Sequence, residues 1–138
     1  MTGTAAIRTI LADNAEIIAL CGNRVYPDYL AEDTQMPAIA LWTVTGTAYD
    51  CMNGGLGFMR DRVRVEAFAN TRGLADQIWL ICNKALTQNP VRGNFGGVQV
   101  SAITQANGPH HLADRPYDGT DKWLYRTIQS FDISYYIY

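Results

Sequence analysis

Apolar and polar residues follow two different spacings along this chain, which predicts both helices and strands. Apolar residues recur three or four positions apart in three segments: up to residue 12, 15–20 and 72–88. Each segment begins near a residue whose side chain can accept a hydrogen bond from an unpaired backbone amide of a first turn. The candidate caps are Thr2 or Thr4, Asp13 or Asn14, and Asn70 or Thr71. We expect two short helices followed later by a long one.

Other segments alternate apolar and polar residues, or are rich in β-branched and aromatic side chains, as strands are. We expect strands at residues 37–47, 58–69, 98–104 and 123–138, and a short extended piece at 24–27. The clearest is 58–69, where Val63, Val65 and Ala67 alternate with charged residues. The glycine-rich stretch 46–57 is interpreted as a flexible hairpin connection, and 105–120 as a polar loop.

The order of these elements predicts the fold class. Two helices precede two strands, and a long helix separates these from two further strands. This order is typical of an α+β protein with a mixed or antiparallel sheet of about four main strands and helices packed on one face. No internal repeat or linker interrupts the pattern, so residues 1–138 are interpreted as a single domain. The other face of the sheet then needs an explanation.

Composition excludes several classes of protein. The 138 residues are 48% apolar and 17% charged, which is typical of a folded domain rather than a disordered chain. The net charge of −2 argues against a nucleic-acid binder, which is normally basic. The three cysteines have no metal-site or disulfide spacing and are interpreted as free thiols. Without an apolar run of membrane-spanning length, we expect a soluble chain made in a bacterial cytoplasm.

Arg60, Arg62 and Arg64 form the sharpest local feature, because they lie on one face of a predicted strand. Side chains two positions apart on a strand are roughly 7 Å from one another, so these like charges repel unless acids balance them. One interpretation is an acidic partner, either a neighbouring subunit or a nucleic-acid backbone. The alternative is a solvated face balanced within the chain by acids such as Asp132 or Glu66.

The sequence offers no recognisable catalytic, cofactor or metal site. It lacks a nucleophile elbow, and the glycines at 54, 55 and 57 lack the Lys-Ser/Thr of a phosphate-binding loop. His110 and His111 with Asp114 nearby are adjacent residues of a predicted loop, a poor arrangement for one ion. We therefore expect a protein that is not an enzyme and needs no cofactor or metal.

The last predicted strand ends the chain with an unusual density of aromatic residues. One row is expected to face the core: Trp123, Tyr125, Phe131, Ile133, Tyr135 and Ile137. Tyr136 and Tyr138 then point the other way. Such a strand is either ordinary core packing or a sheet edge whose unpaired backbone recruits another chain.

The chain resembles the tail completion, or tail terminator, proteins of long-tailed phages and gene transfer agents. The matching residues are Gly22, Arg24 to Pro27, Pro37 to Val44, and Val63 to Leu86, together with the ending YRTIQSFDISYYIY. The resemblance covers nearly the whole chain, but it does not include the 105–120 loop.

This resemblance implies a structural protein of the virion tail or neck that forms a ring, usually a hexamer. The ring caps the tail tube, binds the tail tube protein and a head completion or connector protein, and lets DNA pass through its central hole. On this basis Arg60, Arg62 and Arg64 pair with acids of the adjacent subunit, and the hairpin with Gly54 and Gly55 reaches towards the tail tube. Tyr136 and Tyr138 are further candidate contacts. The alternatives are another neck component, such as a head completion protein, or a small nucleic-acid-binding module.

Overall fold

Capping side chains set the starts of all three α-helices that the structure describes. The computed structural model describes residues 2–28, 35–88, 91–114 and 124–137. Helix α1 (Gly3–Ala12) follows Thr2, α2 (Ala15–Cys21) follows Asn14, and α3 (Arg72–Asn83) follows Thr71. Each of these three caps accepts a hydrogen bond from a first-turn amide of its helix. The three predicted helices are confirmed, and so is one of the two candidate caps for each.

The long helix changes geometry before it ends. It continues from α3 into a π-helical segment, η1 (Lys84–Gln88), rather than remaining an α-helix to residue 88. The hydroxyl of Thr87 donates a hydrogen bond of 2.7 Å to the carbonyl of Asn83, four residues earlier. A side-chain donor of this kind competes with backbone amides for the carbonyl at the end of a helix.

Within the described residues the sheet contains seven strands and is mixed. Their bounds are β1 (Val25–Pro27), β2 (Ala38–Cys51), β3 (Gly54–Ala69), β4 (Gly93–Phe95), β5 (Val98–Gln105), β6 (His110–Asp114) and β7 (Leu124–Tyr136). The spatial order is β1-β2-β3-β7-β5-β4, and β6 also pairs with β7. Only β1 runs parallel to its neighbour, and all other pairs are antiparallel. The α+β class is therefore confirmed.

The expected number of about four strands is too low. The additional strands, β1, β4 and β6, are three to five residues long. Segments this short contain too few residues to show a period of two. Strand β6 lies in the predicted 105–120 loop, where His110–Asp114 pairs with Leu124–Ile128 of β7. Residues 115–120 of that loop lie outside the described residues.

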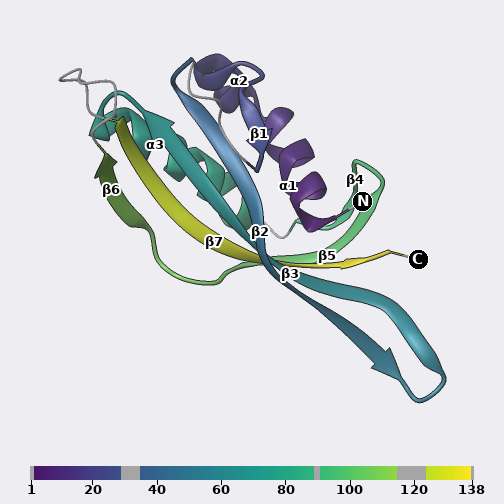
Figure 1. Ribbon diagram of the computed structural model, residues 1–138. Helices are drawn as coiled ribbons and strands as arrows, with labels where there is room; N and C mark the ends of the chain where they lie inside the picture. Colours follow the sequence, from purple (N-terminus) through teal and green to yellow (C-terminus); the bar gives the residue numbers. More distant parts are fainter. Residues whose placement is uncertain (1, 29–34, 89–90, 115–123, 138) are drawn as a thin grey trace.

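The interpretation of residues 46–57 as a flexible connection is wrong. Strand β2 continues to Cys51 and β3 begins at Gly54, so a two-residue turn joins two long strands (Figure 1). Gly46 lies within this ladder, opposite Asp61. A Cβ at residue 46 would be only 2.9 Å from the Oδ1 of Asp61, so a side chain does not fit there. Its glycine thus permits a close approach rather than flexibility. Figure 1 shows this hairpin extending past the helices, and we call residues 46–57 the arm.

The core contains residues from all three helices and from one set of alternating strand positions. On β3 these are Val63, Val65 and Ala67, whose side chains are almost completely buried, as predicted. On β7 they include Phe131 and Ile133. No described core residue belongs to the arm, so the arm does not rely on the core for its shape.

Strand β7 is internal to the sheet, between β3 and β5, so the edge-strand alternative for this segment is wrong. Tyr135 is buried and Tyr136 is 45% exposed, which confirms the predicted alternation at this point. Ile137 was expected to face the core, but it is 46% exposed because it follows the last strand residue. Trp123 and Tyr138 lie outside the described residues.

Candidate assembly surfaces

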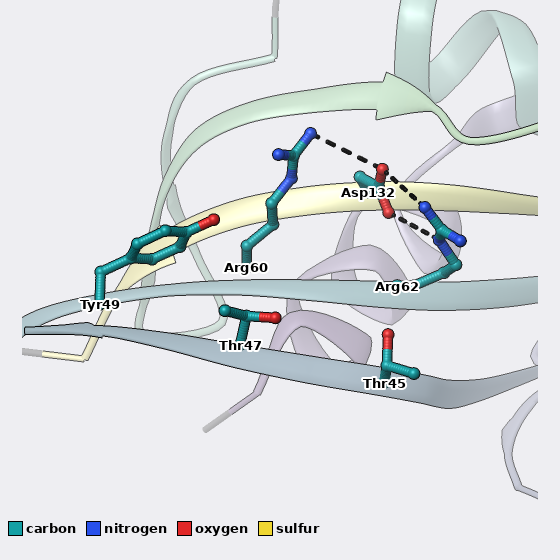
Figure 2. Close-up of a pocket in the computed structure, with 6 residues that line it drawn as sticks. All are labelled: Thr45, Thr47, Tyr49, Arg60, Arg62 and Asp132. Atoms are coloured by element: carbon teal, nitrogen blue, oxygen red, sulfur yellow. Dashed lines mark hydrogen bonds and ion pairs between the residues drawn. The ribbon is translucent and has the colours of Figure 1, made fainter.

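Arg60 and Arg62 share one acid of their own chain. The register of β3 and β7 places Arg62 directly opposite Asp132. The guanidinium of Arg62 donates from Nε to Oδ1 at 3.0 Å and from Nη2 to Oδ2 at 3.4 Å, a two-pronged contact (Figure 2). Arg60 Nη2 lies 3.7 Å from the same Oδ2. The hydrogen bond and the negative charge of Asp132 raise the pKa of Arg62.

Arg64 lies in a second cluster on the same sheet face. Its guanidinium is 3.7 Å from Glu66 Oε1 and stacks over the ring of Trp42 at 5.2 Å. The indole of Trp42 donates to Glu66 at 3.2 Å, and Arg126 Nη1 is 3.8 Å from the second oxygen of Glu66. Glu66 is almost completely buried beneath these groups. Each of the three predicted arginines therefore has an acid of its own chain as an ion-pair partner, which is one of the two alternatives that the sequence left open.

The paired arginines still leave positive charge on this face of the sheet. Four guanidinium groups surround two carboxylates, those of Asp132 and Glu66. Arg60 and Arg62 line an open hollow of about 290 Å³ together with Thr45, Thr47 and Tyr49 (Figure 2). Its lining of hydroxyl, guanidinium and carboxylate groups suits polar contacts with another surface.

The arm exposes apolar side chains. Met52 at its tip is fully exposed and Leu56 is 48% exposed. Gly54 has a φ of 122°, which glycine adopts readily and which here follows the turn. The predicted residues Gly54 and Gly55 pair with Cys51 and Asp50 across the hairpin. They shape the backbone of the arm, while its contact groups are side chains that the sequence analysis did not select.

Tyr136 belongs to an aromatic row where the arm leaves the sheet. The ring of Phe58 lies 5.4 Å from that of Tyr49 and 5.0 Å from that of Tyr136. These three rings come from neighbouring strands β2, β3 and β7 because the register aligns them. The structure therefore places Tyr136 next to the arm. Arg60 and Arg62 follow Phe58 along the same face of β3.

His110 and His111 do not form a metal site within the described residues. The Nδ1 of His111 lies 2.9 Å from Asp76 Oδ1, which fixes β6 against α3. The hydroxyl of Thr127 donates to the same oxygen at 2.7 Å. Partial burial raises the pKa of Asp76, but the contacts with Thr127 and His111 outweigh it, so the pKa is lowered overall. No group of three or more His, Cys, Asp and Glu side chains in the described ranges could hold a metal ion.

Asp61 is a buried acid that the sequence analysis missed. Its Oδ2 accepts hydrogen bonds from the Tyr135 hydroxyl at 2.7 Å and from the Gly3 amide at 3.3 Å. Asp61 therefore connects the first turn of α1 to β7 at the base of the arm, opposite Gly46. Its charge drew attention away from the core, because a charged residue between Arg60 and Arg62 is expected to face water. The alternation itself was the available signal, because it places residue 61 on the same face as Val63.

The contact between Tyr135 and Asp61 predicts a loss of stability at high pH. Burial, together with the hydrogen bond and charge of Asp61, raises the pKa of Tyr135 to about 12. The unfolded chain ionises near the ordinary value of 10.0, so this contribution is complete below that pH and is lost as pH rises through the folded-state pKa. When the pH is raised from about 9 to about 11.5, we expect the free energy of unfolding to fall by about 2 kcal/mol more in the native chain than in the Tyr135→Phe variant.

Urea unfolding of both chains, at about pH 9 and about pH 11.5, measures this difference. The Phe variant lacks the ionisable group but keeps the ring, so it is the control for the native chain in which packing of the ring is retained. An identical decrease in the two chains would contradict the assignment to Tyr135.

Comparison with known proteins identifies the family. None of the helices in the described part of the chain is long and apolar enough to cross a membrane. No curated protein sequence matches the chain significantly. A solved structure described as the virion of a native gene transfer agent particle contains a similar chain, with a TM-score of 0.64 and 13% identity. The match covers 97% of this chain and 94% of the other, which shows a shared fold.

The family model for tail completion protein gp17 matches residues 5–116, which is most of the chain. The matched range includes most of α1, all of α2 and α3, and the whole arm. It ends before β7, which holds the acid that pairs with Arg60 and Arg62. The chain belongs to the tail completion protein gp17 family and is a structural protein of a phage-type tail.

Proposed function

We propose that this chain forms a closed ring that ends the tail tube and joins the tail to the head. Membership of the tail completion family supports a role at the end of the tail. The observation that carries the ring is the presence of two different sheet edges, one at β1 and β2 and the other at β4 and β5. Contacts between unlike surfaces of identical chains run head to tail and close into rings when the rotation allows it.

The partners follow from this position in the particle. One face of the ring contacts the tail tube protein, the other contacts a head completion or connector protein, and DNA passes through the central hole without sequence-specific binding. A six-fold ring is the form that the family likeness favours. The proposed contact residues are Arg60, Arg62, Arg64, Gly54, Gly55, Tyr136 and Tyr138. These roles require binding surfaces and no catalysis.

Removing the gene from its virus or transfer particle tests this function. We expect tails of uncontrolled length that fail to join filled heads, because nothing stops the growth of the tail tube. Supplying the native chain in trans should restore a single tail length and joined particles, as judged by electron microscopy. Tails of normal length that remain separate from heads would instead indicate a head completion protein and would contradict the terminator role.

A further inference from the structure

Two long stretches of strand edge in the described part of the chain lack a partner, one on β2 and one on β5, and they lie on opposite sides of the sheet. Strand β1 covers β2 only at Ile39–Leu41, so the outer edge of β2 is open from Thr43 to Cys51. Strand β4 covers β5 only at Val98–Val100, which leaves the outer edge of β5 open from Ser101 to Gln105. Open edges present unpaired backbone amides and carbonyls, which readily pair with another chain.

A groove follows the open edge of β5. Two adjoining hollows, of about 350 and 430 Å³, share Arg92, Ser101 and Ala102 in their linings. The first also includes Val91 and Ile103, and Tyr136 closes the second. The groove therefore offers apolar surface, a strand edge and one cation in a continuous strip.

The two edges carry complementary charges. Asp50 lies near the tip of the arm on β2, and it is exposed. Arg92, just before β4, is exposed and lines both hollows. Neither has a salt bridge to any other residue that the structure describes. Carboxylate and guanidinium groups form strong paired hydrogen bonds when they meet.

We propose that the arm of one copy lies in the β5 groove of the next copy, with its Asp50 against the neighbour's Arg92. The open edge of β2 then runs beside the open edge of β5, and Met52 and Leu56 lose contact with water. This inference rests on the proposed ring and specifies which surfaces close it. Each copy gives its arm to one neighbour and receives the arm of the other, so one type of contact serves the whole ring.

Physical properties of the arm favour a second copy as its partner. A two-stranded hairpin by itself is marginally stable in water, and the arm adds nothing to the core that could hold it. Figure 1 shows it extending away from the helices, so it is available to a neighbour. The β5 groove of the chain itself has an open strand edge and, in Arg92, a charge opposite to that of Asp50. A second copy can therefore bind the arm without a separate partner protein.

Charge exchange tests the contact in particles that lack the native gene and are supplied with variants in trans. Asp50→Arg and Arg92→Asp should each lower the yield of joined particles at least about tenfold, because like charges meet at every subunit contact. The double variant should restore the yield. Supplying the two single variants together should restore it as well, since alternating copies pair Arg with Asp at each contact. Asp13→Arg, the same charge change as Asp50→Arg at an exposed site just after α1, is the matched control and should have little effect.

Three results separate the possibilities. Native yield from both single variants would overturn the proposed contact and leave the ring intact as a proposal. Loss in the single variants without rescue by the double or mixed variants would also overturn it, and would place another protein, such as the tail tube, against the arm. Failure of the native chain itself to restore joined particles would refute the proposed function instead. Circular dichroism and thermal unfolding of the purified chains confirm that each variant is folded.

Discussion

A chain whose arm is shortened is expected to fold normally and to lose tail completion. Tyr49 and Phe58 face each other across the hairpin, so an Asn-Gly turn can join them in place of residues 50–57. The removed residues make no contribution to the described core. We therefore expect the free energy of unfolding to change by no more than about 1 kcal/mol.

Function should respond much more strongly. The cut removes the exposed side chains of Asp50, Met52 and Leu56 together with the last two residues, 50 and 51, of the open β2 edge. Loss of a central contact of this kind typically costs several kcal/mol of binding, so we expect a fall of about a hundredfold in joined particles. Particle counts by electron microscopy and urea unfolding of the purified chain measure the two effects.

The matched control keeps the arm at full length. Replacing only Met52 and Asn53 by Asn-Gly introduces the same turn sequence without shortening either strand. This control should complete tails better than the shortened chain. If the shortened chain completes tails at the native level, the arm has no role in assembly; if it does not fold, the arm is part of the stable domain.

Replacing Phe131 by Ala is expected to have the opposite effect, a large loss of stability. The Phe131 side chain is completely buried on β7, opposite Val63 of β3 and Gln105 of β5. Because strands on both sides hold the backbone, the cavity cannot collapse easily. Truncation should cost about 3–5 kcal/mol in the free energy of unfolding, measured in urea.

Tyr136→Ala on the same strand is the contrasting variant. This side chain is 45% exposed and packs mainly against Phe58, so its loss should cost about 1 kcal/mol. It lines the β5 groove, and its removal should reduce particle joining more than it reduces stability. Equal destabilisation by the two substitutions would contradict the assignment of opposite faces to residues 131 and 136.

Local patterns in the sequence were sufficient to predict the helices, their caps and the inward face of β3. Those features depend on residues within a few positions of one another, such as Thr71 and the amide of Leu74. The length of the arm was not predicted because glycine usually signals flexibility. Gly46 instead accommodates Asp61, a contact between strands that depends on the register. The short strands β4 and β6 likewise depend on pairing partners that lie elsewhere in the chain, whereas β1 lies in the extended piece expected at 24–27.

The candidate surface was predictable in part. The arginines at 60, 62 and 64 were identified from their alternation, and the acids that balance them were among those considered. The pairing of Arg60 and Arg62 with Asp132 depends on the pairing of β3 with β7, which no local pattern gives. Glu66, by contrast, is two residues from Arg64 on the same strand. Arg92 was missed because a single cation between a helix and a short strand has no pattern. Its proposed role comes from the groove that β5 forms beside it.

The buried carboxylate of Asp61 gives the arm a pivot. It lies at the base of the hairpin and is bonded to the start of α1 and to Tyr135 of β7. A sideways force on the tip acts with the full length of the hairpin as its lever. Among the contacts that resist it at the base are the pairing of β3 with β7, the two hydrogen bonds to Asp61, and the close approach of the Asp61 carboxylate to Gly46. A displacement of the arm therefore acts on the first turn of α1 through Asp61.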